Sequence, residues 1–226
     1  MTPIQELFKT LRFISNADGL SAEQVKTLLP ILATEKNLRE EKRIKYLLHR
    51  SGLRPIKNVE SFDWKFNPKL PKEELLEMVG TDWNKEVRNY LLIGPTGVGK
   101  SHMANSACYQ AIRRGTPAAF ITCSDLVGKL ENSRNKSATI EYYASLKLLC
   151  IDEIGYVFPK KDECDGIFQI IAKRSELTST IVTTNLFPSD WNTVFPAATA
   201  SAILDRLSFN GKFLTCEGDT YRRKRK

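Results

Sequence analysis

The sequence has no long apolar run, no internal repeat and no low-complexity tract. No apolar stretch approaches the roughly 20 residues that a membrane-spanning helix needs. The start of the chain, MTPIQELFKTLRF, has neither the charged beginning nor the apolar centre of a secretory signal. We therefore expect a cytoplasmic protein with no membrane partner. Its 226 residues are enough for one large domain, or for one domain with a small appendage.

The cysteines show no C-x-x-C spacing, so no zinc site is indicated. Three of the five lie within apolar segments, which favours small buried side chains in a reducing compartment. They are Cys108, Cys123, Cys150, Cys164 and Cys216.

The clearest motif is GPTGVGKS at residues 94–101, a complete G-x-x-x-x-G-K-[ST] phosphate-binding loop. It follows an apolar run at 90–93, typical of a buried strand, and precedes a helical pattern at 101–114. This context disfavours the alternative of a glycine-rich turn that fits the motif by chance. The glycines let backbone N–H groups approach phosphates closely. The predicted ATP contacts are Gly94, Pro95, Thr96, Gly97, Val98, Gly99, Lys100, Ser101 and His102.

A second apolar run, residues 148–151, ends in two adjacent carboxylates and resembles a Walker B strand. We expect Asp152 to hold Mg²⁺ together with the Ser101 hydroxyl, and Glu153 to polarise the attacking water. Lys100 is expected to reach the β- and γ-phosphates. The alternative is an acidic turn after a core strand. The phosphate loop about fifty residues upstream makes that alternative weaker.

Two further polar residues are weaker candidates for the same chemistry. Asn185 ends the apolar run at 181–184, at the sheet edge where open α/β folds keep their ligands. By pattern alone it could equally be a residue that turns the chain after a strand. Arg206 lies on the amphipathic stretch SAILDRL, and by itself would more readily form a surface ion pair.

From residue 59 onward, strand patterns alternate with helix patterns, which predicts an α/β fold with a parallel sheet covered by helices on both faces. The predicted strands are 90–93, 118–122, 148–152, 180–184 and 212–215. The predicted helices are 100–114, 124–132, 138–145, 162–176 and 199–208.

Residues 1–58 are predicted to form a small helical unit, with 59–226 as the second domain. Ile4, Leu7, Phe8 and Leu11 have helical spacing, and a capped helix restarts at residues 21–24. We expect a turn at Pro30 and a third helical segment over 35–48.

The net charge of +8 is concentrated in two places. Residues 42–57 carry six cations and no acid, and the last five residues, 222–226, are all basic. Both clusters favour DNA as a partner, bound through its phosphates and with little sequence specificity. The alternative for each is a solvated helix face or a frayed tail.

Taken together, the motifs resemble those of the IstB-like helper ATPases of DNA transposition, AAA+ proteins related to DnaC-type helicase loaders. The resemblance covers nearly all of residues 90–222. It is carried by GPTGVGKSHMA, FITCSDLVGKL, LLCIDEIGYVFP, FQIIAKR, STIVTTN, SAILDRL and EGDTYR.

The resemblance implies an AAA+ P-loop core whose Asn185 is the sensor 1 residue and whose Arg206 acts as an arginine finger on a neighbour's ATP. It also implies an ATP-dependent homo-oligomer on duplex DNA that recruits a partner transposase. After residue 222 the sequence leaves no room for a C-terminal helical lid, so no second sensor is assigned. A helical insertion near residues 125–136 would face DNA. The predicted DNA contacts from the basic run are Lys42, Arg43, Lys45, Arg50 and Arg54, and those from this insertion are Lys129, Arg134 and Lys136. Each of the last three could equally be an ordinary solvated side chain.

Two other functions compete with this interpretation. A helicase loader would use the same ATPase as a timing switch in replication, with the N-terminal unit contacting the helicase. A small-molecule kinase would need an arginine-rich lid over the phosphates, which the sequence does not show. A structural role without hydrolysis is disfavoured because both Lys100 and Glu153 are present.

Overall fold

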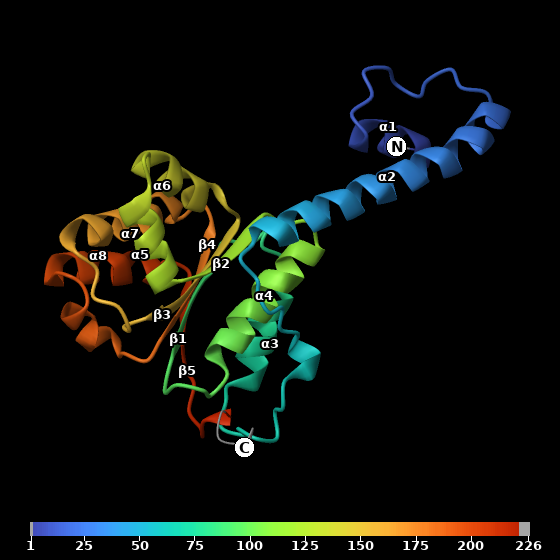
Figure 1. The fold of residues 1–226 in the computed structure, drawn as a ribbon. Helices are drawn as coiled ribbons and strands as arrows, with labels where there is room; N and C mark the ends of the chain where they lie inside the picture. The colour runs from blue at the N-terminus through green and yellow to red at the C-terminus, as the bar shows by residue number, and fades with distance from the viewer. Residues whose placement is uncertain (1, 222–226) are drawn as a thin grey trace. The chain divides into compact units, whose positions relative to one another are not determined.

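The structure, a computed structural model, describes residues 2–221. The chain divides into two compact units, Met1–Tyr46 and Leu47–Lys226 (Figure 1). Each unit is described by itself. The domain boundary expected between residues 58 and 59 stays a prediction.

The second unit is built on a five-stranded parallel sheet with the strand order β2-β3-β4-β1-β5. The three central strands are almost wholly buried, as expected for parallel strands covered on both faces. The predicted α/β fold is confirmed, with strand bounds within two residues of those expected. The strands are β1 (Asn89–Ile93), β2 (Ala118–Thr122), β3 (Leu148–Ile154), β4 (Ser179–Thr184) and β5 (Gly211–Thr215).

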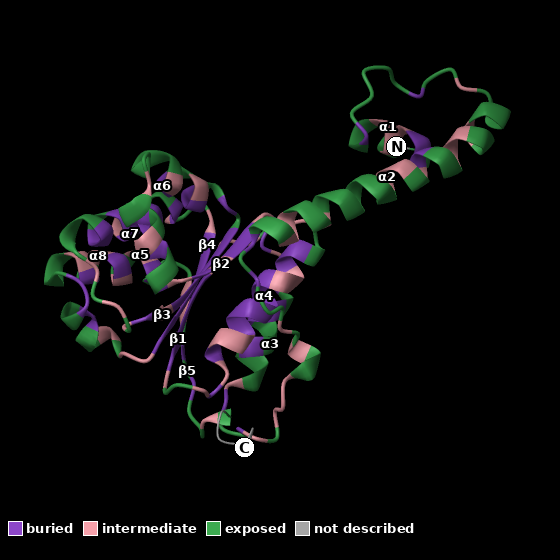
Figure 2. Cartoon of the chain, in the orientation of Figure 1, coloured by how far each residue is buried: buried purple, intermediate pink, exposed green. Residues whose placement is uncertain are grey.

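Helices cover both faces of this sheet (Figure 1). On one face α4 (Lys100–Arg113) packs against β2, β3 and β4, and α3 (Lys72–Gly80) packs on α4. The other face is covered by α5 (Cys123–Asn132), α6 (Lys136–Ser145), α7 (Lys161–Arg174) and α8 (Ala197–Ser208). Figure 2 shows the strands and the helix surfaces turned toward them as buried. Two short 3₁₀ helices complete the unit, η1 (Val59–Ser61) and η2 (Pro188–Thr193).

A buried arginine ties α6 and α7 to the sheet. The Arg174 side chain at the end of α7 is 1% exposed. It donates to the carbonyls of Tyr143 and Leu146, each at 2.7 Å, and to Thr180 Oγ1 at 3.0 Å. Because a buried guanidinium is costly without partners, these bonds make Arg174 a structural cross-link.

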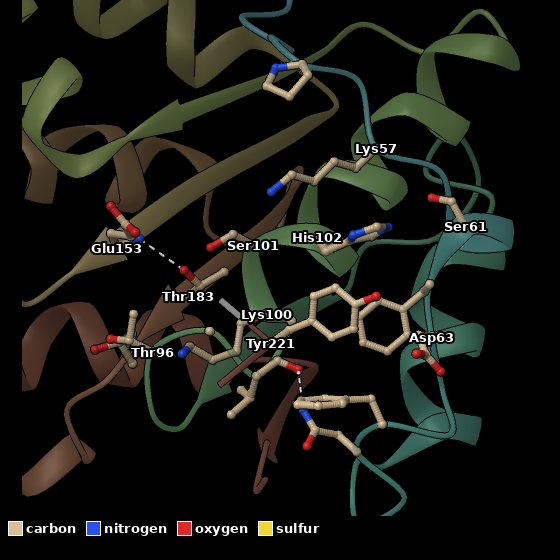
Figure 3. A pocket seen from close by; sticks show the side chains of 18 of the residues that line it. Lys57, Ser61, Asp63, Thr96, Lys100, Ser101, His102, Glu153, Thr183 and Tyr221 are labelled. Carbon is tan, nitrogen blue, oxygen red and sulfur yellow. Dashed lines mark hydrogen bonds between the residues drawn. The ribbon is translucent and has the colours of Figure 1, made fainter. Parts of the chain in front are cut away.

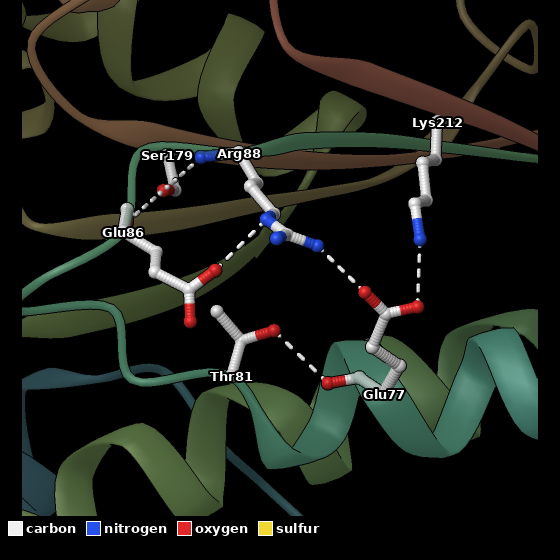
Figure 4. Close-up of polar contacts among 6 residues, drawn as sticks. All are labelled: Glu77, Thr81, Glu86, Arg88, Ser179 and Lys212. Carbon is white, nitrogen blue, oxygen red and sulfur yellow. Dashed lines mark hydrogen bonds and ion pairs between the residues drawn. The ribbon is translucent and has the colours of Figure 1, made fainter.

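At the amino end of the sheet, Glu77 of α3 joins two strands by ion pairs (Figure 4). Its carboxylate accepts from Arg88, just before β1, and from Lys212 of β5, each at 2.6 Å. Glu86 also pairs with Arg88, at 2.9 Å. All of these side chains are substantially exposed, so the pairs contribute modestly to stability.

The first unit holds α1 (Pro3–Thr10) and most of α2 (Ala22–Arg50). Its core consists of Ile4, Leu11, Ala17 and Leu32. The predicted helix start is confirmed, because Gln24 N–H donates to Ser21 Oγ at 3.3 Å and Ser21 N–H donates back to Gln24 Oε1 at 2.8 Å.

The predicted turn at Pro30 is wrong, since α2 runs through it as one helix of 29 residues. A proline inside a helix removes one backbone hydrogen bond and crowds the preceding turn. On both sides of Pro30, apolar side chains pack into the unit's core, namely Leu28, Leu29 and Leu32. This packing offsets the local cost, and it cannot be seen from the proline itself.

All five cysteines are buried free thiols. Burial raises the pKa of Cys123 to about 12, with a smaller contribution from nearby Cys164. Among residues 2–221, no helix is both long enough and apolar enough to cross a membrane.

Candidate nucleotide-binding site

The phosphate loop joins β1 to α4, as the motif predicts. Gly94, Gly97 and Gly99 have φ angles of 152°, 86° and 117°, a region that L side chains rarely adopt. Packing adds a second restriction. A Cβ on Gly94 would lie 2.0 Å from the Cys216 carbonyl oxygen, and one on Gly97 would lie 2.1 Å from Thr220 Oγ1. The loop therefore requires glycine for its conformation and for its close contact with the segment after β5.

Lys100 begins α4, and its side chain turns back across the loop. The residue is 8% exposed, and Nζ donates to the carbonyls of Gly94 at 2.7 Å and Pro95 at 2.8 Å. The first turn of α4 contains no acidic residue, so the positive end of the helix and the Lys100 charge act together. This combination of exposed N–H groups and a cation suits an anionic phosphate chain.

The two adjacent carboxylates within β3 have different surroundings. Asp152 is 5% exposed and accepts a hydrogen bond from Thr183 Oγ1 at 2.5 Å. Glu153 has a φ of 61°, at an irregularity in the pairing of β3 with β4, and it lines the site cavity. Its N–H donates to the same Thr183 hydroxyl at 3.0 Å (Figure 3). A left-handed non-glycine residue is strained, and such strain is typical of functional sites.

Asn185 follows β4 and lies beside the turn after Glu153. A Cβ on Gly155 would lie 2.9 Å from Asn185 Oδ1. Among the residues that the structure describes, this buried oxygen has no hydrogen-bond partner. An orphaned amide oxygen beside the turn that follows Glu153 is suited to bind a water molecule, bulk or metal-bound. The oxygen donors Ser101, Asp152 and Asn185 are the kind that Mg²⁺ prefers, so the residues fit that ion.

A cavity of about 620 Å³ is lined by Lys100, Ser101 and Glu153, whereas Asp152 and Asn185 are not among its lining residues (Figure 3). The phosphate loop, the first turn of α4, Glu153 and Thr183 form one wall. The opposite wall is a segment that the sequence analysis did not assign to the site, residues 55–67, which we call the strap segment, together with Tyr221.

The strap segment lines the cavity with aromatic rings. Phe62 lies edge-on to His102 with ring centroids 5.1 Å apart, and Phe66 lies edge-on to Tyr221 at 4.9 Å. Phe62 also lies against the phosphate loop, since a Cβ on Gly99 would lie 2.5 Å from its ring. A cavity that combines phosphate-binding groups with aromatic rings is suited to a nucleotide. The alternating aromatics at 62, 64 and 66 were the available sequence signal, but nothing in the sequence placed them beside the phosphate loop.

Hydrogen bonds fasten the strap segment and the C-terminal part to the loop. Asn67 Nδ2 donates to the Asp219 carbonyl, and Asp219 N–H donates to Asn67 Oδ1, both at 2.9 Å. Tyr221 N–H donates to the Gly97 carbonyl at 3.0 Å. On the far side of the loop, the hydroxyls of Thr96 and Tyr156 share a hydrogen bond. The cavity walls are therefore held by residues distant in sequence.

Arg206 does not line this cavity. It lies on α8, on the opposite face of the sheet from α4, with its guanidinium 5.0 Å from the Phe168 ring centroid. Its Nη1 donates to the Ala202 carbonyl at 2.9 Å. The finger role expected for Arg206 stays a prediction, and the geometry leaves action on another subunit as its route.

The predicted DNA contacts fall into separate places. Arg50, Arg54 and Lys129 line a second cavity of about 440 Å³, where Lys129 Nζ donates to Tyr143 Oη at 2.9 Å. Lys136 lies 3.8 Å from the Asp162 carboxylate. The remaining residues lie on α2 in the first unit or between α5 and α6, and the basic run 222–226 lies outside the described residues. Those on α2 are Lys42, Arg43 and Lys45, and the one between α5 and α6 is Arg134.

Solved structures of low sequence identity share this fold. AMPPCP-bound DnaA from Aquifex aeolicus has a TM-score of 0.61 and 18% identity over 75% of this chain. A crystal structure of DnaI has a TM-score of 0.57 and 15% identity, covering 78% of this chain and 92% of DnaI. The chain spans about half (52%) of the DnaA chain. These likenesses identify the AAA+ fold.

Sequence relatives are closer. The ATP-binding protein named for insertion sequence IS232, from Bacillus thuringiensis subsp. berliner, is 33% identical over 88% of this chain and 81% of its own length. The one named for IS21, from Pseudomonas aeruginosa, is 30% identical over 86% of this chain and 75% of its own. The family described as IstB-like ATP binding protein matches residues 8–226. The chain therefore belongs to the IstB-like ATP-binding proteins.

Proposed function

We propose that the protein is a DNA-binding ATPase that assembles on duplex DNA in the presence of ATP and stimulates a transposase. The observation that carries the ATPase part is the single cavity shared by the phosphate loop and Glu153. The transposition part rests on family membership and on relatives named for insertion sequences. The cytoplasmic location stays a prediction from sequence.

In the proposed hydrolysis, each residue of the site has a distinct role. Lys100 exchanges its two carbonyl partners for phosphate oxygens, and the α4 N–H groups bind the same anion. Ser101 and Asp152 would hold Mg²⁺, which would supply neutralisation of the phosphate charge. Glu153 takes a proton from a water that Asn185 positions. That water adds to the γ-phosphorus while the bond to the bridging oxygen breaks, releasing ADP and phosphate.

Assembly completes the site in this proposal. The cavity contains no arginine of its own among its lining residues, and Arg206 lies on the opposite face of the sheet. A finger arginine from a neighbouring subunit stabilises transition-state charge in many related reactions. Hydrolysis would then report that subunits have assembled.

DNA contact is proposed at the second cavity. It gathers Arg50 and Arg54 with the distant Lys129 around the hydroxyls of Thr122 and Ser124, with Asp125 as the one acidic residue among its described lining residues. Cations and hydroxyls bind backbone phosphates without reading bases, so binding should depend steeply on salt. The test is a triple substitution of Arg50, Arg54 and Lys129 to Gln. Its control removes equal charge at exposed residues elsewhere in the unit, with Lys69→Gln, Arg113→Gln and Lys147→Gln.

The decisive experiment measures ATP hydrolysis by the full chain alone, with duplex DNA and with single-stranded DNA, alongside the size of the assembly. Glu153→Gln serves as a variant that binds ATP without turning it over. Stimulation and large assemblies on duplex DNA support the proposal. A response confined to single strands, or present only with a replicative helicase, would instead support a helicase loader.

A further inference from the structure

Lys57 belongs to the strap segment, and its side chain extends into the nucleotide cavity (Figure 3). By sequence it closes the basic run 42–57, which suggested a DNA surface. In the structure it shares the cavity with Lys100, Ser101 and Glu153. Its surroundings therefore differ from those of the other cations in that run.

The backbone of Lys57 is fixed against α4 on both sides of its Cα. Its N–H donates to Asn105 Oδ1 at 2.8 Å, and its carbonyl accepts from Ser106 Oγ at 3.1 Å. Asn105 is 4% exposed and Ser106 is fully buried, so neither partner can move freely. Asn105 lies one helical turn after Ser101, so the Lys57 side chain starts one turn away from the phosphate loop. This anchoring holds the stem of the lysine close to the loop.

The Lys57 side chain extends across the cavity on the side of Ser101 and Glu153 (Figure 3). Within residues 2–221, Lys57 forms no ion pair, although Asp63 and Glu153 line the same cavity.

We propose that Lys57 is a second phosphate-binding lysine of the nucleotide site, acting within the same subunit as Lys100. The ligand class is the polyphosphate chain of a nucleoside triphosphate, so the inference rests on the proposed ATP site. A compact ammonium on a flexible stem suits mobile phosphate oxygens. Its anchored backbone reduces the entropy lost when the contact forms.

The test compares Lys57→Gln, Lys57→Arg and the control Lys65→Gln by direct titration with a fluorescent ATP analogue and competition by ATP, ADP and adenosine. Lys65 is an exposed lysine of the same segment that does not line the cavity. Removing one charged phosphate contact should weaken ATP binding about tenfold. Adenosine competition should be unchanged, because adenosine carries no phosphate. Lys57→Arg should recover most of the ATP affinity, since it keeps the charge.

Three outcomes would overturn the inference. ATP affinity could be unchanged in Lys57→Gln. The loss could be as large for adenosine as for ATP, which would indicate a packing defect. Lys65→Gln could weaken ATP binding equally, which would indicate a long-range field. The proposed ATP site fails separately, and visibly, if the wild-type chain does not bind ATP or if Lys100→Ala binds it as tightly as wild type.

Discussion

The Thr183 hydroxyl connects the two acidic residues to which the proposed mechanism assigns metal binding and water activation. It donates to Asp152 at 2.5 Å and accepts from the Glu153 N–H at 3.0 Å, and Thr183 itself is 1% exposed. Thr183→Val keeps the shape of the side chain and removes only the hydroxyl. Both partners would then lose a hydrogen bond to this buried hydroxyl.

The expected cost follows from these two bonds. A hydrogen bond to a charged group contributes roughly 1.5–3 kcal/mol, and an unpaired buried N–H costs roughly 1–3 kcal/mol. We therefore expect Thr183→Val to lower the free energy of unfolding by about 3 kcal/mol. Thr183→Ser keeps the hydroxyl and loses one methyl, so it should cost about 1 kcal/mol. Urea unfolding of the two variants separates the hydroxyl from the methyl.

The same variants test the mechanism. Glu153 is held in a left-handed conformation by its neighbours, and its carboxylate should move when the Thr183 bond is lost. A misplaced base of this kind is expected to lower kcat about a hundredfold. ATP affinity should change less than about threefold, because Thr183 supplies no phosphate contact. Equal kcat and equal stability in wild type and Thr183→Val would refute the role given to this hydroxyl.

Three further predictions concern other parts of the fold. Arg206→Ala and Glu153→Gln should each lack ATPase activity on DNA. A 1:1 mixture of the two variants should recover about a quarter of the wild-type ATPase activity, because one neighbouring pair in four combines an intact Glu153 with an intact Arg206. No recovery would contradict an arginine finger that acts between subunits. Arg174→Met should lower the free energy of unfolding in urea by about 3–5 kcal/mol, because it leaves buried carbonyls without hydrogen-bond donors. Lys173→Met, at an exposed neighbouring residue, should lower it by less than about 1 kcal/mol. Glu77 has a lowered pKa, chiefly through its hydrogen bond from Lys212 and with help from Arg88. Its stabilisation is therefore complete above the ordinary value of 4.5 and is lost as pH falls below it, so the urea midpoints of wild type and Glu77→Gln should differ at pH 7 and converge near the acid limit of folding.

The sequence predicted the sheet and the phosphate loop well for a physical reason. Parallel strands buried on both faces are continuous apolar runs, and the loop chemistry needs glycines, lysine and a hydroxyl at fixed spacing. The carboxylates of β3 were predictable because they follow such a run directly. Thr183 was not, because a threonine inside a β-rich stretch has no local feature that reveals a partner on the neighbouring strand.

The strap segment was missed for a different reason. Its contacts join residues that are far apart along the chain, such as Asn67 with Asp219 and Lys57 with Asn105. No periodicity records such pairs. The Pro30 error has the same origin, because the packing of α1 on α2 outweighs a local helix-breaking signal.

The basic run 42–57 shows most clearly what composition leaves open. A run of like charges gives the amount of charge but does not say where each side chain lies. The sequence analysis therefore interpreted the run as one surface. In the structure Lys42, Arg43 and Lys45 lie on α2 in the first unit, Arg50 and Arg54 line the second cavity, and Lys57 lines the nucleotide cavity. The division has a cause in backbone hydrogen bonding. The Phe120 N–H donates to the Ser51 carbonyl at 2.7 Å at the edge of β2, and Lys57 is then bound to α4. Seven residues after α2 ends, the chain has crossed from one cavity to the other, so cations that look alike in the sequence line different cavities.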